Sequence, residues 1–418
     1  MKKYIFLSYF LCFVGLLQAQ ATFTIPDVNF FNAILSNDAS VISDANNLAV
    51  NCSTCANYGT GSLRLSCIDS LNITTLNLGA SNIVDLQGIT HFVDLLSLSC
   101  VGNQLTSLPN LPNTLNSLDC SYNQLTILPT LPNNLTNLNC VSNQLTILPT
   151  LPSNLIELNC AANSLTSLPP LPSTLINFNC QENQLVSLPT LPNGLERLEC
   201  AWNQLTTLPS PLPPNIWRFY CNDNQLSALP NPLPSGLIEL GCNNNLLSLL
   251  PNLPNTLQNL YSSTNLLTSL PILPQGLLTL GCGDNQLTSL PNLPNTLLEL
   301  VCSDNPITCL PLLPNSLSLL NIFNTNITCF PNLYFGVLVL SNYLPLCNEI
   351  DNPACMGLSA VGMSEYYPSG AMRTRIIDNL YLPFTAPAPM NLPSPVEYQL
   401  AVFDIATNIR DTVAVLGG

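Results

Sequence analysis

Three consecutive stretches of this chain decide its fold: LDCSYNQLTILPTLPNNL at residues 118–135, LNCVSNQLTILPTLPSNL at 138–155 and LNCAANSLTSLPPLPSTL at 158–175. The same line recurs about every twenty residues from Leu98 to Ile327. A fixed period of roughly twenty to thirty residues is typical of a solenoid, in which each repeat forms one coil stacked on its neighbours. Because a solenoid offers one long, flat or concave face and no central pocket, the repeat bears on function as well as on fold.

An asparagine marks the same place in eleven repeats: Asn103, Asn123, Asn143, Asn163, Asn183, Asn203, Asn224, Asn245, Asn265, Asn285 and Asn305. Each unit reads L-x-x-L-x-C-x-x-N-x-L-x-x-L-P-x-L-P-x-x, which resembles the leucine-rich repeat, and its LPxLP ending and short period resemble the bacterial short class of that family. The resemblance covers roughly residues 71–345. It implies a leucine-rich-repeat solenoid with a curved parallel β-sheet on the concave side and extended or polyproline-II return segments on the convex side.

The residues themselves predict the same coil. In Leu118-Asp119-Cys120 the alternation of apolar and polar side chains predicts a half-buried strand, with Asp119 pointing outward. Two prolines in the return segment of each repeat argue against a helix there and favour extended backbone. We expect the asparagine amide to bond backbone groups of its own and neighbouring coils. Counting from Leu76 to Leu340 predicts about fourteen strands in one parallel sheet.

The first 21 residues read as a secretory signal peptide. Lys2 and Lys3 precede an apolar run from Tyr4 to Leu17 and then Gln18-Ala19-Gln20-Ala21. Once this segment is removed, six arginines face twenty-three acids, a net charge of −17. Nucleic acid and anionic membranes are therefore poor partners, because both need a basic surface. No later segment is apolar enough to enter a membrane, so we expect a secreted or cell-surface protein.

The seventeen cysteines of the mature chain fall into two groups. Ten occupy one inward-facing place in the repeat, where Ser262 replaces the eleventh: Cys100, Cys120, Cys140, Cys160, Cys180, Cys200, Cys221, Cys242, Cys282 and Cys302. We expect these to be reduced, buried and apolar in role, with a hydroxyl in the same place lacking a partner. The other seven flank the array and are expected to form mostly disulfides: Cys52, Cys55, Cys67, Cys309, Cys329, Cys347 and Cys355.

The organisation of the rest of the chain follows from the repeat. Residues 22–70 are expected to form an N-terminal cap, opened by a short amphipathic capping helix that begins near Asp27. Residues 71–345 form the repeat array, 346–355 a C-terminal cap, and 356–418 a linker or partial C-terminal module. The IPDxNF segment that starts at Ile25, followed by a divergent first coil, resembles exported leucine-rich repeat proteins of Bacteroidota-type bacteria.

Catalytic motifs are missing from the sequence. The single histidine, His91, has no nucleophile elbow with it, and the sequence contains no P-loop, no HExxH motif and no EF-hand loop. We expect neither cofactor nor metal, and the thiol column lacks the basic partners that a thiolate metal site would need. A glycan hydrolase using Glu199 and Glu239 is a third reading, but two strands place them about 10 Å apart on an open sheet.

The outward positions of the predicted strands are the candidate binding face. Counting the first leucine of each unit as position one, position three reads Ser97, Ser117, Asn137, Glu157, Asn177, Arg197, Arg218, Glu239, Asn259, Thr279 and Glu299. Position five reads Ser99, Asp119, Asn139, Asn159, Asn179, Glu199, Tyr220, Gly241, Tyr261, Gly281 and Val301. Large and charged side chains gather in the middle coils, which gives a candidate ligand-binding set of Arg197, Glu199, Trp202, Arg218, Tyr220, Glu239, Gly241 and Tyr261.

Two interpretations of that set remain open. Tyr220 and Tyr261 stand two strands apart over Gly241, so together the three residues could form a slot for a flat group, with the arginines orienting a polar ligand. Alternatively the tyrosines only cover their glycine neighbours, and Arg218 with Glu239 is a weak surface pair. The sequence favours a non-catalytic, exported module that binds a protein or glycan, with adhesion as one role and a secreted effector of a host protein as the alternative. It leaves the oligomeric state open.

Overall fold

The computed structural model describes residues 22–35, 42–44, 56–57, 62–64, 72–333, 337–341, 344–347, 373–377, 380–384, 398–403 and 410–415. Apart from the eight-residue helix α2 (Val28–Leu35) and the short 3-10 helix η2 (Ile89–His91), its elements are strands. The first of these are β1 (Thr22–Thr24), β2 (Ile42–Asp44), β3 (Ala56–Asn57), β4 (Ser62–Arg64) and β5 (Ile73–Asn77).

One strand of three residues then follows in each coil. These are β6 (Ser97–Ser99), β7 (Ser117–Asp119), β8 (Asn137–Asn139), β9 (Glu157–Asn159), β10 (Asn177–Asn179), β11 (Arg197–Glu199), β12 (Arg218–Tyr220), β13 (Glu239–Gly241), β14 (Asn259–Tyr261), β15 (Thr279–Gly281), β16 (Glu299–Val301), β17 (Leu319–Asn321) and β18 (Leu338–Leu340). The remaining strands are β19 (Arg373–Ile377), β20 (Leu380–Phe384), β21 (Tyr398–Phe403) and β22 (Arg410–Val415).

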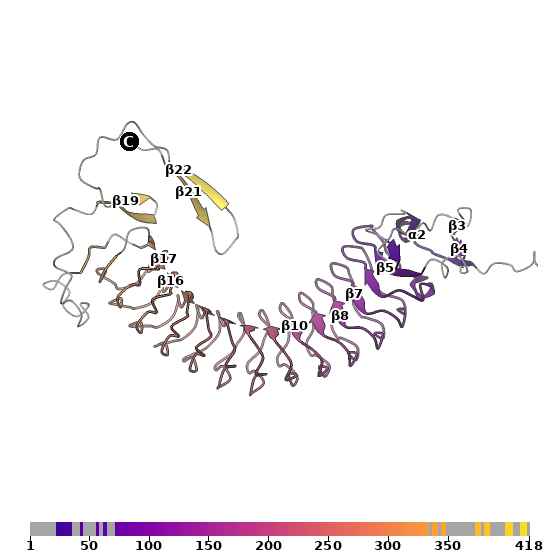
Figure 1. Ribbon diagram of the computed structural model, residues 1–418, viewed down its shortest axis with the longest axis horizontal. Helices are drawn as coiled ribbons and strands as arrows, with labels where there is room; N and C mark the ends of the chain where they lie inside the picture. The colour runs from indigo at the N-terminus through magenta and orange to yellow at the C-terminus, as the bar shows by residue number, and fades with distance from the viewer. Residues whose placement is uncertain are drawn as a thin grey trace, which may run out of the picture.

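The fourteen strands from β5 to β18 form one parallel sheet, as the repeat count predicts. Neighbouring strands pair without a register slip, so position three always faces position three and position five faces position five. The coils follow an arc, and the strands line its inner, concave side (Figure 1). Helix η2 lies in the return segment between β5 and β6, and from β6 to β17 the return segments on the outer side contain neither helix nor strand. The fold is therefore the leucine-rich-repeat solenoid that the repeat predicts.

The turn after each strand depends on a left-handed residue at position eight. Tyr122, Trp202 and even the β-branched Thr264 have φ values of 55°, 56° and 55°. This backbone conformation is uncommon outside glycine and costs some free energy. It directs the N–H of position eight to the next coil, where Tyr122 N donates to the carbonyl of Val141 at 2.8 Å. Stacking thus holds each turn in place.

The repeated asparagine bonds buried backbone groups of adjacent coils, as predicted. The Asn123 amide donates through Nδ2 to the carbonyls of Cys100 and Cys120 at 2.9 and 3.1 Å. Its Oδ1 accepts from the N–H of Leu105 at 3.0 Å. The same arrangement recurs further along the array, for example at Asn183. Without this amide several buried backbone groups would have no partner, so the asparagine column is structural.

The ten repeat cysteines are free and buried, which agrees with the predicted apolar role. Burial raises the pKa of Cys160 to about 12, so the thiol stays neutral and unreactive. The expectation that a hydroxyl there lacks a partner is wrong. Ser262 Oγ donates to the Gly281 carbonyl of the next coil at 3.2 Å, just as Cys160 Sγ lies 3.5 Å from the Asn179 carbonyl.

Helix α2 packs on the first coil and buries Phe30, Phe31 and Ile34 in the core that continues through the array. Asp27 caps it as expected, because its Oδ1 accepts from the N–H groups of Asn29 and Phe30 at 2.8 and 3.0 Å. Its Oδ2 accepts from the N–H groups of residues 84 and 85 at 2.6 and 3.0 Å, which ties the helix to the array. Burial works to raise the pKa of Asp27, but these four bonds outweigh it and lower the pKa.

At the C-terminal end, a disulfide joins Cys329 to Cys347, and Cys309 is also disulfide-bonded. Strand β18 ends the parallel run and pairs antiparallel with β20. The predicted signal peptide at 1–21 and the cysteines at 52, 55, 67 and 355 lie outside the described residues, as does most of the predicted cap at 346–355. The expected boundaries of the domains stay predictions.

Candidate binding face

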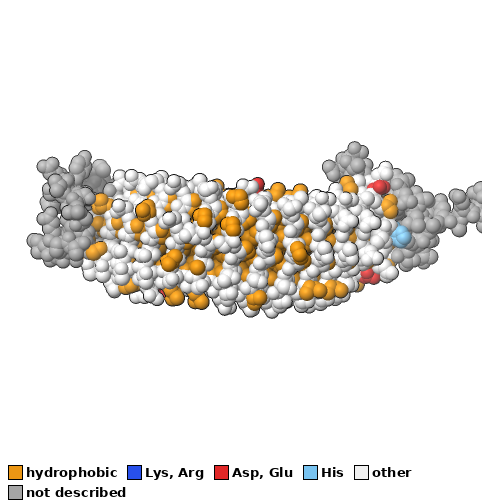
Figure 2. Space-filling view, turned by 90° about the horizontal axis from the view of Figure 1, so that it is seen from below, with side chains coloured by type: hydrophobic (Ala, Val, Ile, Leu, Met, Phe, Trp, Pro, Cys, Tyr) orange, Lys and Arg blue, Asp and Glu red, His pale blue; other side chains and the backbone are white. Residues whose placement is uncertain are grey.

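The two surfaces of the arc differ in charge. Each return segment runs from the repeated asparagine to the apolar residue at position one of the next repeat. Between Asn103 and Leu317 these segments contain no Asp, Glu, Lys or Arg. Seen from the convex side, the central band of the array shows uncharged polar and apolar side chains, and acidic side chains are visible only at its rim and toward one end (Figure 2). The charged side chains of these coils belong to the strands and to the turns and residues directly beside them. Any electrostatic recognition therefore occurs on the concave side or its edges.

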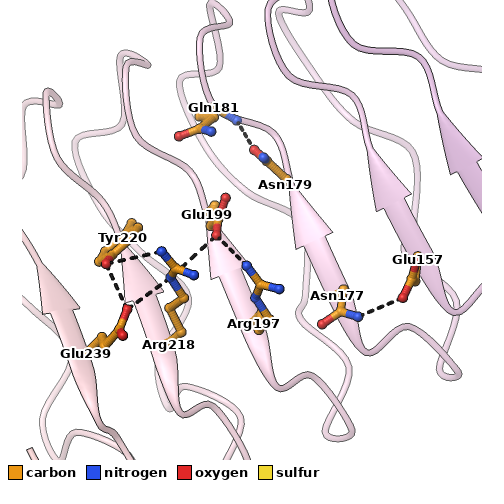
Figure 3. A network of polar contacts seen from close by, with 9 residues as sticks. All are labelled: Glu157, Asn177, Asn179, Gln181, Arg197, Glu199, Arg218, Tyr220 and Glu239. Carbon is orange, nitrogen blue, oxygen red and sulfur yellow. Dashed lines mark hydrogen bonds and ion pairs between the residues drawn. The ribbon is translucent and has the colours of Figure 1, made fainter. Parts of the chain in front are cut away.

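Four charged side chains and one tyrosine form a network across β11, β12 and β13 (Figure 3). Glu199 Oε1 lies 3.1 Å from Arg197 Nη2 and 3.7 Å from Arg218 Nε. Arg218 Nε lies 3.1 Å from Glu239 Oε2, which also accepts a 2.8 Å hydrogen bond from the Tyr220 hydroxyl. Five of the eight residues in the sequence-predicted set are thus brought together here, with two positive and two negative charges that compensate one another.

We call these five residues the charge network: Arg197, Glu199, Arg218, Tyr220 and Glu239. A contact between a guanidinium and an aromatic ring stiffens it further. The Arg218 guanidinium lies 4.7 Å from the centre of the Tyr220 ring, within the range of a cation–π contact. Burial raises the pKa of Tyr220, and its hydrogen bond to Glu239 raises it further, so the hydroxyl remains a proton donor. The network presents a preformed pattern of donors and acceptors.

One aromatic residue of this region was missed by sequence reasoning and another was misplaced. The Arg197 guanidinium lies 5.7 Å from the ring centre of Trp217, at position two of the next coil. Trp202, included in the predicted set, lies instead in the left-handed turn with 59% of its surface exposed. The sequence contains a signal for this contact, because Trp217 follows one coil after Arg197. The prediction took only positions three and five as outward, and Trp217 is at position two.

The predicted slot between the two tyrosines is not preformed. Tyr220, Gly241 and Tyr261 do face one another across β12, β13 and β14. However, a Cβ added to Gly241 would lie 2.7 Å from Cδ1 of Tyr220, so that ring already covers the glycine. Tyr261 stands in the same way beside Gly281, where the added Cβ would be 3.6 Å away. The geometry supports the second interpretation, in which each tyrosine covers its glycine neighbour.

A hollow of about 410 Å³ lies beside the network, over β7 to β11. Its lining includes Asp119, Asn139, Glu157, Asn159 and Asn179, which occupy predicted outward positions but lie outside the predicted binding set. The hollow exists because these short side chains leave space next to the longer arginines and tyrosines. The Glu157 carboxylate is held there by the amides of Asn137 and Asn177 at 2.7 and 3.1 Å.

Glu199 and Glu239, the two carboxylates of the glycan-hydrolase hypothesis, both form ion pairs with arginine. Arg218 lies between Glu199 and Glu239 and contacts both, so a sugar could not occupy the space between them without displacing it. In the part of the chain that the structure describes, no group of three or more His, Cys, Asp or Glu side chains is arranged to hold a metal ion. None of the described helices is long and apolar enough to cross a membrane.

Solved structures of bacterial proteins share this fold. YopM from Yersinia enterocolitica WA-314 matches 65% of this chain with a TM-score of 0.63 and 36% identity, and this chain spans 60% of its length. YopM from Yersinia pestis, described as a leucine-rich effector protein, matches 66% of this chain with a TM-score of 0.54 and 30% identity, over 91% of its own length. The chain therefore belongs to the leucine-rich repeat proteins.

More distant structures show the fold alone. The functional domain of InlJ from Listeria monocytogenes, which includes a cysteine ladder, matches 75% of this chain and 78% of its own, with a TM-score of 0.52 and 22% identity. No protein-family model and no curated protein matches the sequence. Nearest-neighbour stacking of the coils leaves one extended concave surface, the kind of surface that repeat proteins use for binding.

Proposed function

We propose that this chain is an exported recognition module, built from short LPxLP leucine-rich repeats, that binds a protein through its concave face without catalysing a reaction. The observation that carries the proposal is the segregation of charge. The strands hold the charge network and the acids, whereas the return segments from Asn103 to Leu317 are uncharged. Complementary charge steers association and selects partners, so a charged, patterned face suits recognition.

The signal peptide predicted at residues 1–21 supports export. Two fates are then compatible with a binding module. A role at the surface of the producing cell, as in adhesion, is one fate of an exported module. A role as a secreted effector that binds a host protein is favoured by the likeness to YopM of Yersinia pestis, which is described as an effector. A glycan is the second ligand class, but the lining of the concave hollow contains no aromatic residue besides the 1% exposed Phe178, so a sugar ring lacks a stacking surface.

The experiment is a binding screen with two matched variants. The mature chain is immobilised and exposed to arrayed secreted and cell-surface proteins and to an oligosaccharide array. Arg218→Ala with Tyr220→Ala removes the centre of the charge network, whereas Thr206→Ala with Thr207→Ala alters two exposed convex residues of the same region. We expect the first pair to weaken capture of a protein at least tenfold and the second pair to leave it unchanged.

Urea unfolding of both variants serves as the control for folding. Equal capture by the two variants would place the binding surface elsewhere on the chain. Capture of oligosaccharides alone would replace the protein ligand by a glycan. Localisation of the native protein, on the producing cell or in the medium, separates adhesion from the effector role.

A further inference from the structure

The hollow over β7 to β11 contains carboxylates without a cationic partner. Between Leu98 and Leu333 the sequence has ten Asp and Glu residues but only two Lys or Arg, which are Arg197 and Arg218. Both arginines are engaged with Glu199 and Glu239 in the charge network. Glu157 and Asp119 are held by uncharged groups alone. Within residues 98–333, the concave face therefore carries negative charge that no Lys or Arg of these coils compensates.

Glu157 is preorganised to bind a cation. Asn137 and Asn177 flank it on the adjacent strands and donate to its two oxygens, one each (Figure 3 shows the bond to Asn177). An ionised carboxylate accepts about four hydrogen bonds, so roughly two acceptor sites remain. Because the amides already fix the side chain, binding a ligand there loses little further rotamer freedom. The carboxylate lies on β9, the middle strand of the hollow.

Asp119 extends the same arrangement at one end of the hollow. Its Oδ1 accepts from the N–H and hydroxyl of Ser121 at 3.0 and 2.6 Å, and its Oδ2 accepts from the Asn139 amide at 3.0 Å. It lies two strand spacings from Glu157, a distance of about 10 Å. The whole hollow spans four strand spacings, or about 19 Å. An extended peptide of about six residues has that length.

We propose that the hollow docks an extended, basic segment of the protein partner, with lysine or arginine side chains on Glu157 and Asp119. The inference rests on the proposed function and names the chemistry of the partner. Charge complementarity favours a basic segment over an acidic or neutral one. The arginines at the β11 end would repel a basic side chain. The basic side chains of the partner are therefore directed toward Asp119 on β7 and Glu157 on β9. Amide groups along the floor hydrogen-bond the peptide backbone.

The test uses a fluorescent eight-residue peptide with three lysines and its counterpart with glutamine at those places. Binding to the full mature chain is measured by anisotropy at low and physiological salt. Glu157→Gln keeps the shape of the side chain and removes its charge. Glu299→Gln, at position three of β16, is the matched control, because it is equally exposed on the same face and changes the net charge by the same amount.

We expect the lysine peptide to bind and the glutamine peptide not to bind. Glu157→Gln should weaken binding at least fivefold, Asp119→Asn at least threefold, and Glu299→Gln less than twofold. Equal weakening by Glu157→Gln and Glu299→Gln would show that the peptide responds only to the net negative charge of the protein. That result would overturn the proposal. So would binding of a neutral oligosaccharide that the lysine peptide does not displace. If the peptide fails to bind while capture of an arrayed protein still depends on Arg218 and Tyr220, only the basic segment is refuted and the proposed function stands.

Discussion

The interior of the solenoid and its concave face contain the same residue types and use them differently. Asn183, inside the array, donates to the carbonyls of residues 160 and 180 and accepts from the N–H of Leu165. The side-chain amide of Asn177, six residues earlier and on the strand surface, donates instead to the carboxylate of Glu157. The first type recurs in every regular coil, whereas the outward positions change from coil to coil. Uniform positions build the solenoid, and variable positions are free to recognise a partner.

The largest expected effect breaks the uniform interior. Asn183→Ala should lower the free energy of unfolding by roughly 3 kcal/mol, because it leaves several buried backbone groups without a partner. Urea denaturation followed by circular dichroism measures this. Asn177→Ala on β10 is the control, and it should cost less than about 0.5 kcal/mol as a surface change. Similar losses in the two variants would show that the asparagine column is not what holds the coils together.

A second change tests how tightly the concave face is packed. Gly241→Ala places a Cβ 2.7 Å from the ring of Tyr220 and should displace it, at a cost of about 1–3 kcal/mol. Gly236→Ala is the matched control, because an added Cβ there meets no atom within 4 Å. Thermal unfolding compares the two. A neutral Gly241→Ala variant would mean that the Tyr220 ring moves aside freely and that the charge network is not rigid.

The N-terminal end offers a pH-dependent comparison. Asp27→Ala should lose about 1–2 kcal/mol, because it removes the helix cap. The lowered pKa of Asp27 means that its stabilisation is complete above the unfolded value, near 4, and is lost as the pH falls through the folded value. Wild-type stability should therefore decline more steeply than that of Asp27→Asn as the pH falls below about 4. Parallel curves for the two proteins would contradict the assigned cap.

The smallest effect concerns the cysteine column. Cys160→Ser should cost about 1 kcal/mol or less, because the hydroxyl can donate to the Asn179 carbonyl as Ser262 does to Gly281. In the native wild type, the pKa of about 12 at Cys160 predicts no reaction with iodoacetamide at pH 8. Mass spectrometry with and without denaturant measures both the redox state and the labelling. Rapid native labelling of Cys160 would mean that the coils open readily.

The period determined most of what could be predicted from the sequence. It located the strands, the inward cysteines and the bonding role of the asparagines, because stacking in register leaves each position one environment. Side-chain rotamers do not follow from a period, which is why the sequence left open whether Tyr220 borders a slot or covers Gly241, as its ring in fact does. The hollow was missed for a related reason. A search for large and charged residues overlooks the space that short ones such as Asn159 leave between them.

The most direct test of the central claim measures stability and binding together for the two asparagines. Asn183→Ala and Asn177→Ala are compared by urea unfolding and by capture of the arrayed protein that wild type retains. The account predicts that Asn183→Ala loses roughly 3 kcal/mol of stability. Under conditions in which this variant is folded, it should bind as wild type does. Asn177→Ala should keep its stability and bind several-fold more weakly, because Glu157 loses one of its two anchoring amides. Loss of binding in Asn183→Ala while it is fully folded, with unchanged binding in Asn177→Ala, would contradict the division of the molecule into a structural interior and a recognition face.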